Sequence, residues 1–99
     1  MEVEKYEISY WSVVVRKDLP RIDGVWRDII KQAIAGKLAI NPNLFGTPLR
    51  QTLRGYRKLR IANYRVIYRI ERREVKIIAI GHRSEVYKEM MKRIGKYVS

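Results

Sequence analysis

Apolar and polar positions in the first half of the chain predict one strand followed by two helices. Residues 4–11 (EKYEISYW) alternate between the two kinds of side chain and are rich in strand formers, which is typical of a half-buried strand. Residues 12–19 (SVVVRKDL) predict a short helix whose end Pro20 follows. In residues 23–37 apolar side chains recur at i, i+1, i+4 and i+5 behind an N-capping Asp23, which predicts an amphipathic helix.

The second half of the chain predicts a loop, three strands and a final helix. Two prolines and a glycine in NPNLFGTPL make residues 41–49 a loop. The strands are RKLRI (57–61), YRVIYRI (64–70) and EVKIIAI (74–80), and short turns join them. The helix covers residues 84–94, with Ser84 as its N-cap and Gly95 as its stop. The order β-α-α-β-β-β-α predicts an α+β fold, in which two N-terminal helices pack on one face of a small antiparallel sheet that a C-terminal helix completes.

Two-residue turns set the register of the three strands and therefore the face that each side chain occupies. Directly paired residues share a face, so pairing across the first turn separates cationic from apolar side chains. The charged face carries Lys58, Arg60, Arg65 and Arg69. The opposite face carries Leu59, Ile61, Tyr64, Val66 and Tyr68, which helices can cover. The same register through the second turn pairs Arg69 with Lys76 and places Ile67, Ile78, Ile80 and His82 on the charged face.

Composition narrows the class of protein. The chain has 99 residues, of which 46% are hydrophobic, so we expect one compact domain over residues 1–99. No apolar run approaches the roughly 20 residues that span a bilayer. The first residues also lack the features of a signal peptide, so we expect a cytoplasmic protein with no membrane partner. Because the chain has no cysteine and one histidine, we expect neither a metal site nor a cofactor.

The charge balance points to a polyanionic partner. The chain has 22 Lys and Arg residues against 10 Asp and Glu residues, a formal net charge of +12, which favours RNA, DNA or an acidic protein. No carboxylate neighbours the cations of the charged face, and each close pair costs a few tenths to about 1 kcal/mol. A solvated face with splayed side chains is the plain alternative. We favour an anion site, because the isoleucines on the same face imply a partly dry floor.

The charged face suits the chemistry of an RNA phosphodiester. RNA supplies its own nucleophile, the 2′-OH, so the protein has only to remove a proton, stabilise the phosphorane and protonate the leaving 5′ oxygen, and no metal is required. Lys58 is the candidate base, and the arginines remain charged. Tyr87 lies in the first turn of the last predicted helix and is a candidate surface for stacking a base. A plain helix-packing role fits the spacing of Tyr87 equally well.

Three motifs resemble those of the RelE/ParE superfamily of bacterial and archaeal toxins. The motifs are L-x-G-Y-x-x-L-R, Y-R-V-I-Y and I-G-H-R-x-x-V-Y, which lie between Pro48 and Arg93, and the resemblance covers nearly the whole chain. It implies a RelE-like fold related to microbial RNases, and the toxin of a type II toxin–antitoxin system. Proteins of the RelE branch cleave messenger RNA in the A site of the 70S ribosome by 2′-OH attack, which inhibits translation. The resemblance therefore implies a metal-independent endoribonuclease, and a cognate acidic antitoxin that wraps it.

The resemblance also implies roles by position. Lys58 matches the candidate base, Arg65 the arginine that stabilises the phosphorane, Arg83 the candidate general acid and Tyr87 the base-stacking tyrosine. Residues expected to bind RNA are Arg54, Arg60, Arg69 and His82. His82 remains an alternative to Arg83 as the proton donor. Tyr56 departs from the pattern, because some RelE proteins carry a second lysine at this position.

Two further functions stay open. A ParE-like toxin would inhibit DNA gyrase and cleave nothing, although such proteins generally lack the combination of basic residues and tyrosine seen in this chain. A basic RNA-binding module without catalysis is the other alternative. The joint presence of the basic residues and Tyr87 favours the nuclease.

Overall fold

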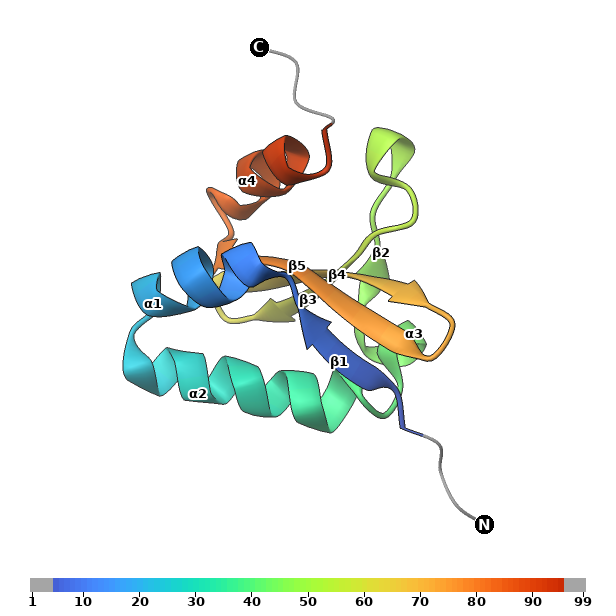
Figure 1. Cartoon of the computed structure of the whole chain (residues 1–99), viewed down its shortest axis with the longest axis horizontal. Helices are drawn as coiled ribbons and strands as arrows, with labels where there is room; N and C mark the ends of the chain where they lie inside the picture. The colour runs from blue at the N-terminus through green and yellow to red at the C-terminus, as the bar shows by residue number, and fades with distance from the viewer. Residues whose placement is uncertain (1–4, 96–99) are drawn as a thin grey trace.

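The computed structural model describes residues 5–95 and contains a five-stranded sheet with helices on both faces (Figure 1). The strands are β1 (Glu7–Tyr10), β2 (Thr47–Pro48), β3 (Arg57–Ile61), β4 (Tyr64–Glu71) and β5 (Glu74–His82). Their order across the sheet is β1-β5-β4-β3-β2. Pairing is antiparallel from β2 to β5, whereas β1 runs parallel to β5. The predicted α+β class is confirmed, and the parallel β1 is a feature that the sequence pattern did not indicate.

Helical segments connect the strands and follow β5. They are η1 (Val14–Asp18), α1 (Leu19–Arg21), α2 (Gly24–Ala33), η2 (Ile34–Leu38), α3 (Pro42–Phe45), η3 (Gln51–Leu53) and α4 (Val86–Arg93). The first helix continues through Pro20 to Arg21, because the turn before the proline is a π-helix that does not use the i→i−4 bond. The predicted loop over 41–49 contains α3 and β2, since Pro42 starts a helix at a position where its missing N–H costs nothing. Among residues 5–95 no helix is long and apolar enough to cross a membrane.

Each face of the sheet has its own apolar core. Buried side chains of η1, α1, α2 and η2 pack against Val66 and Tyr68 of β4 on one face. On the other face Val86 and Met90 of α4 pack against Ile67 of β4 and its neighbours. In Figure 1, α2 accordingly lies below the sheet and α4 above it. The predicted packing of the two N-terminal helices on one face is confirmed.

The predicted register is correct for β3, for β4 and for the start of β5. Every pair between β3 and β4 is as predicted, including Arg60 opposite Arg65. Arg69 lies opposite Lys76, as the two-residue turn between β4 and β5 requires. Apart from Arg57, which is paired with Tyr68 and faces the other way, the cations of β3 and β4 therefore share one surface of the sheet. We call this surface, which carries Lys58, Arg60, Arg65 and Arg69, the basic face.

A β-bulge reverses the faces at the end of β5. The register shifts between Ile67 and Tyr68, which leaves Ile78 without a partner on β4. Beyond the shift the pairs are Ile67–Ala79, Val66–Ile80 and Tyr64–His82. Ile80 and His82 therefore lie on the face that α1 and α2 cover, and their predicted placement on the charged face is wrong. Strict alternation fails here because the bulge inserts one extra residue, and nothing in the local periodicity of β5 indicates it.

A buried ion pair covers the edge of β5 that β1 leaves open. β1 pairs with β5 only as far as Ile77. Beyond that point the Ile80 amide donates to the Asp18 carboxylate (2.9 Å), and Arg93 donates to the Ile78 carbonyl (2.9 Å). Arg93 and Asp18 also bond to each other through two contacts of 2.7 Å, and this bonding holds the pKa of Arg93 above its usual value. The pair ties η1, β5 and α4 together.

The start of α4 differs from the prediction, whereas its end does not. The helix begins at Val86 with Glu85 as its N-cap, because the hydroxyl of Ser84 lies 2.8 Å from Nδ1 of His82 instead of capping the helix. Gly95 follows the last turn with φ of +74°, a conformation that favours glycine after a helix. The predicted stop is therefore confirmed.

Candidate nucleic-acid interface

The basic face lies between two raised segments. In Figure 1, α4 rises on one side of it, and the segment that links β2 to β3 rises on the other. Leu49, Leu53 and Tyr56 of that linking segment, residues 49–56, pack on the same apolar cluster as Tyr87 of α4. This cluster includes Ile67, the strand partner of Lys58. The cations of the basic face therefore border an apolar floor.

Lys58 and Tyr87 meet above this floor. The Lys58 Nζ lies 6.0 Å from the centroid of the Tyr87 ring, at the outer limit of a cation–π contact. Both side chains are half-buried. Among residues 5–95 no carboxylate forms an ion pair with Lys58. The structure thus brings together two residues that the sequence places 29 positions apart, with the ammonium charge left for an anionic ligand.

Three arginines gather at the turn between β3 and β4. Arg60 and Arg65 oppose each other directly, so two like charges share one position of the basic face. Arg65 is only 9% exposed, and its Nη1 donates to the carbonyls of Ala62 (3.0 Å) and Tyr64 (2.8 Å). Arg83 is exposed, and its backbone amide donates to another carbonyl of the same turn.

Arg65 also stabilises an unfavourable backbone conformation. Ala62 has φ of +53°, in the left-handed region that costs a residue with a Cβ about 1–2 kcal/mol. The bond from Arg65 to the Ala62 carbonyl helps to hold this turn. Arg60, in contrast, is exposed, and its side chain makes no hydrogen bond or ion pair with other residues in 5–95. The two opposed arginines therefore differ in how freely each can turn to a ligand.

At one end of the basic face a carboxylate offsets part of the positive charge. Glu71 lies 2.7 Å from the Lys76 Nζ and accepts a hydrogen bond of 2.9 Å from the Arg69 Nη2. These bonds, with Lys76 as the larger cause, hold the pKa of Glu71 below its usual value, so the carboxylate is charged at neutral pH. The expectation that no carboxylate neighbours the cations is therefore wrong at this end. Arg69 also lies over the ring of Tyr56, with its Cζ 5.9 Å from the ring centroid.

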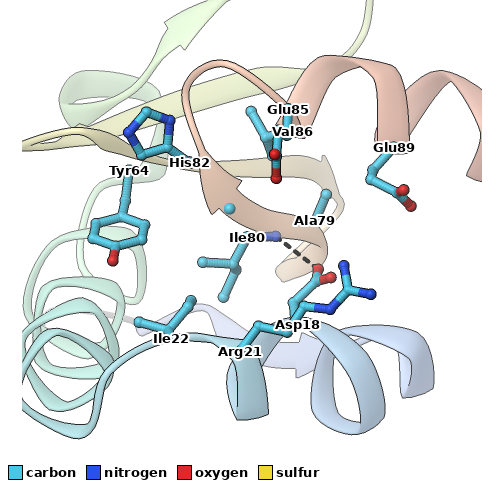
Figure 2. Close-up of a pocket in the computed structure, with 11 residues that line it drawn as sticks. Asp18, Arg21, Ile22, Tyr64, Ala79, Ile80, His82, Glu85, Val86 and Glu89 are labelled. Atoms are coloured by element: carbon cyan, nitrogen blue, oxygen red, sulfur yellow. Dashed lines mark hydrogen bonds between the residues drawn. The ribbon is translucent and has the colours of Figure 1, made fainter.

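His82 lies beside a cavity, whose lining residues Figure 2 shows. The cavity has a volume of about 180 Å³, and residues of α1, β5 and α4 line it. Its walls include Tyr64, whose ring meets that of His82 edge to face at 6.3 Å between centroids. Glu85 lines the same cavity. Because His82 pairs with Tyr64 and not with the row of Lys58, the structure does not bring it to the basic face.

The remaining predicted residues add little to the geometry of the face. Arg54 is exposed, directly after η3 in the 49–56 segment. Within the described part of the chain, no group of three or more His, Cys, Asp or Glu side chains could hold a metal ion.

Sequence reasoning missed the contribution of Tyr56 and Glu71 to the basic face. Both carried a signal, because Tyr56 alternates with Lys58, and Glu71 lies two residues after Arg69 on β4. Only the contact of Glu71 with Lys76 requires the pairing of β4 with β5.

Comparisons with known proteins find toxins. A sequence model of the family described as "ParE toxin of type II toxin-antitoxin system, parDE" matches residues 10–87. The toxin RelE of Mycobacterium tuberculosis is 33% identical over 85 residues, which cover 84% of this chain and 87% of that protein. The toxin RelG of the same organism is 30% identical over 80 residues, which cover 79% of this chain and 92% of that protein.

Solved structures share the fold. One chain of the toxin–antitoxin complex RelBE2 from Mycobacterium tuberculosis is 27% identical with a TM-score of 0.76, and the match covers 85% of this chain and 98% of that one. A variant of the Escherichia coli toxin RelE in the free state is 22% identical with a TM-score of 0.73, over 91% of this chain and 98% of that one. The second likeness is a likeness of fold.

Proposed function

We propose that this chain, which belongs to the RelE/ParE superfamily of type II toxin–antitoxin toxins, is an endoribonuclease that cleaves messenger RNA on the ribosome. Membership of the superfamily does not by itself choose between cleavage of RNA and inhibition of gyrase. The choice rests on the meeting of Lys58 and Tyr87 on the basic face, next to the opposed arginines. A cation able to exchange a proton, a ring able to stack a base and fixed positive charge are the parts that RNA cleavage needs.

The proposed reaction is an attack by the RNA on itself. Lys58, acting as the neutral amine, takes the proton from a 2′-OH and becomes an ammonium, and the resulting oxygen attacks the adjacent phosphorus. Arg65 and Arg60 stabilise the additional negative charge of the phosphorane. The bond from phosphorus to the 5′ oxygen then breaks, Arg83 donates a proton to that oxygen, and a 2′,3′-cyclic phosphate remains. Tyr87 holds a neighbouring base by stacking, so that the 2′-OH, the phosphorus and the leaving oxygen come into line.

The ribosome supplies what the small basic face lacks. The basic face offers a few cations and an apolar floor, and fixed positive charge alone does not orient an RNA strand. A messenger RNA presented in the A site of the 70S ribosome would arrive already splayed and oriented, which is the costly part of positioning. We therefore propose the ribosome and messenger RNA as partners, and expect free RNA to be cleaved slowly or not at all.

We also propose a cognate antitoxin as a partner. A relative of this chain was solved as one component of a toxin–antitoxin complex. The net charge of +12 favours an acidic chain that covers the basic face. Bound there, it would neutralise the cations and exclude RNA in one step.

Inhibition of DNA gyrase is the second candidate function, and one observation favours it. The family model that matches residues 10–87 carries the name of the ParE toxins. A gyrase inhibitor needs no general base, so the position of Lys58 beside Tyr87 would then have no catalytic purpose. The two functions differ in their products, which allows one set of variants to separate them.

A translation extract programmed with a defined messenger RNA tests the proposal. With the unaltered chain, primer extension should show breaks inside the A-site codon, and the fragments should end in a 2′,3′-cyclic phosphate and a 5′-hydroxyl. Lys58→Met should slow the cleavage by about 10²- to 10⁴-fold, which is the range of general base catalysis. Lys88→Met is the matched control, because it removes the same charge from an exposed position of α4 beside Tyr87.

The outcomes separate the candidates. Equal cleavage by the two lysine variants would remove Lys58 from the mechanism. Intact messenger RNA together with inhibited supercoiling by gyrase would select the ParE-like function and refute the nuclease.

A further inference from the structure

Tyr56 continues the row of side chains that faces the proposed site. It precedes β3 directly, and its alternation with Lys58 and Arg60 puts the three residues on one face. The backbone of Tyr56 is held on both sides, since its carbonyl accepts from the Leu49 amide (2.9 Å) and its amide donates to the Leu53 carbonyl (3.2 Å). The residue therefore has a fixed place at the foot of the 49–56 segment.

A chain of charged contacts orients the Tyr56 ring. The Arg69 guanidinium lies over it at 5.9 Å, Glu71 holds Arg69 at 2.9 Å, and Lys76 holds Glu71 at 2.7 Å. The ring is half-buried and rests on the same apolar cluster as Tyr87. Arg69, which was expected to bind RNA, thus also serves as the support of an aromatic ring.

The basic face therefore carries two tyrosines of similar construction. Tyr87 comes from α4 and has Lys58 near its ring, and Tyr56 comes from the 49–56 segment and has Arg69 near its ring. Both rings border the floor made by Ile67 and its neighbours. An aromatic ring beside a cation binds a nucleobase by its π-face and the adjoining phosphate by charge, and such stacking tolerates any base.

We propose that Tyr56 is a second base-stacking residue, which binds a base of the RNA strand next to the nucleotide that stacks on Tyr87. This inference rests on the proposed function, which supplies the RNA strand. An RNA strand with one base on each tyrosine would pass over Lys58, which follows Tyr56 by two residues in the chain. The rings of Tyr56 and Tyr87 would then together fix the position of the scissile phosphate.

The chain offers a matched control for a tyrosine beside an arginine. Arg73 lies 4.3 Å from the centroid of the Tyr6 ring. Tyr6 precedes β1, at the opposite edge of the sheet, and packs on the cluster beneath α1 and α2. A substitution there removes the same kind of pair without approaching the basic face.

The test combines protein variants with altered messages on the ribosome. Tyr56→Met keeps an apolar side chain but removes the ring, Tyr56→Phe keeps the ring, and Tyr6→Met is the control. Each is assayed for kcat/KM on a normal message and on messages with one abasic nucleotide placed in turn at each position around the cleaved bond. Tyr56→Met should lower kcat/KM by roughly 5- to 100-fold on the normal message. Tyr56→Phe, which keeps the ring, should recover most of the activity that Tyr56→Met loses, and Tyr6→Met should cleave as the unaltered chain does.

The messages with an abasic nucleotide show whether Tyr56 stacks on one particular base of the RNA. At one position, loss of the base should slow the unaltered chain as much as Tyr56→Met does, and Tyr56→Met should add no further loss there. Additive losses at every position would overturn the stacking role of Tyr56 and leave the proposed function standing. A Tyr56→Phe variant as slow as Tyr56→Met would do the same. Failure of the unaltered chain to cleave any message would instead overturn the proposed function, and this inference with it.

Discussion

At the scale of single residues, the structure separates cations that are free to meet a ligand from cations that also hold the fold. Arg60 and Arg65 are direct strand partners of the same charge. Arg60 is exposed, whereas Arg65 is nearly buried and donates two hydrogen bonds to the turn that follows β3. An arginine that donates from one nitrogen still has others to offer a phosphate, so the two roles of Arg65 are compatible.

The matched pair predicts different costs of substitution. Arg65→Ala should lower the free energy of unfolding by about 1–3 kcal/mol, because two backbone carbonyls lose their donor and one of them belongs to the left-handed Ala62. Arg60→Ala should change it by less than about 0.5 kcal/mol. Both variants should abolish or weaken growth arrest. Urea denaturation beside a growth assay measures the two effects, and equal stability of the two variants would contradict the structural role of Arg65.

At the scale of elements, the edge of β5 decides how α4 is held. β1 ends at Tyr10, opposite Ile77 of β5, and the bulge leaves Ile78 outside the β4 ladder. Backbone groups that lack a strand partner need other hydrogen-bond partners. Asp18 accepts from the Ile80 amide, and Arg93 donates to the Ile78 carbonyl. Asp18 comes from η1 and Arg93 from the last turn of α4, so this pair sets where the helix that carries Tyr87 can lie.

The pair should therefore matter for both stability and activity. Both side chains are less than 10% exposed, and removing one partner of a buried pair costs about 3–5 kcal/mol. Asp18→Ala and Arg93→Ala should each lower the free energy of unfolding by such an amount, and the double variant by clearly less than their sum. The measurement is chemical denaturation of all three variants.

The neighbouring ion pair provides the control for this cycle. Lys17 and Glu89 are 3.3 Å apart and partly exposed, so Lys17→Ala, which leaves the contact of Glu89 with Arg93 in place, should cost less than about 1 kcal/mol. Losses that simply add in the double variant would mean that Asp18 and Arg93 act independently. Slower message cleavage by Asp18→Ala at temperatures where it remains folded would connect the pair to the placement of Tyr87.

At the scale of the whole molecule, the positive charge is uneven. The net charge is +12, but Glu71 forms ion pairs with Arg69 and Lys76 at one end of the basic face. Lys58 and Arg60 have no such partner among residues 5–95. A polyanion should therefore be bound chiefly by the middle of the face and by its end nearest the turn between β3 and β4.

The salt dependence of RNA binding measures which cations of the basic face contact phosphates. Affinity for a single-stranded RNA falls with salt by a log–log slope of about 0.7 for each phosphate contact. Arg60→Gln should reduce the slope by about that amount, whereas Lys76→Gln, whose cation is bonded to Glu71, should leave it nearly unchanged. Fluorescence anisotropy between about 50 and 200 mM salt gives both slopes. Equal slopes for the two variants would mean that both cations contribute equally to RNA binding, whatever their ion-pair partners.

The sequence by itself determined the strands β3 to β5, their turns, the helical character of residues 24–38 and the sharing of one face by Lys58, Arg60, Arg65 and Arg69. These features follow from local rules: a period of two in strands, a period near four in helices, and the short turns that set the register. The same rules are the reason that the prediction failed at His82, because alternation counts residues and a bulge adds one.

Only the tertiary structure decided the rest. It placed β1 parallel to β5, bonded Asp18 to Arg93 and set Tyr87 beside Lys58. Most of these contacts join residues that are far apart along the chain, and their geometry depends on how two faces of a sheet are packed at once. No local period carries that information, because the burial of an ion pair or the tilt of a helix is a property of the assembled core.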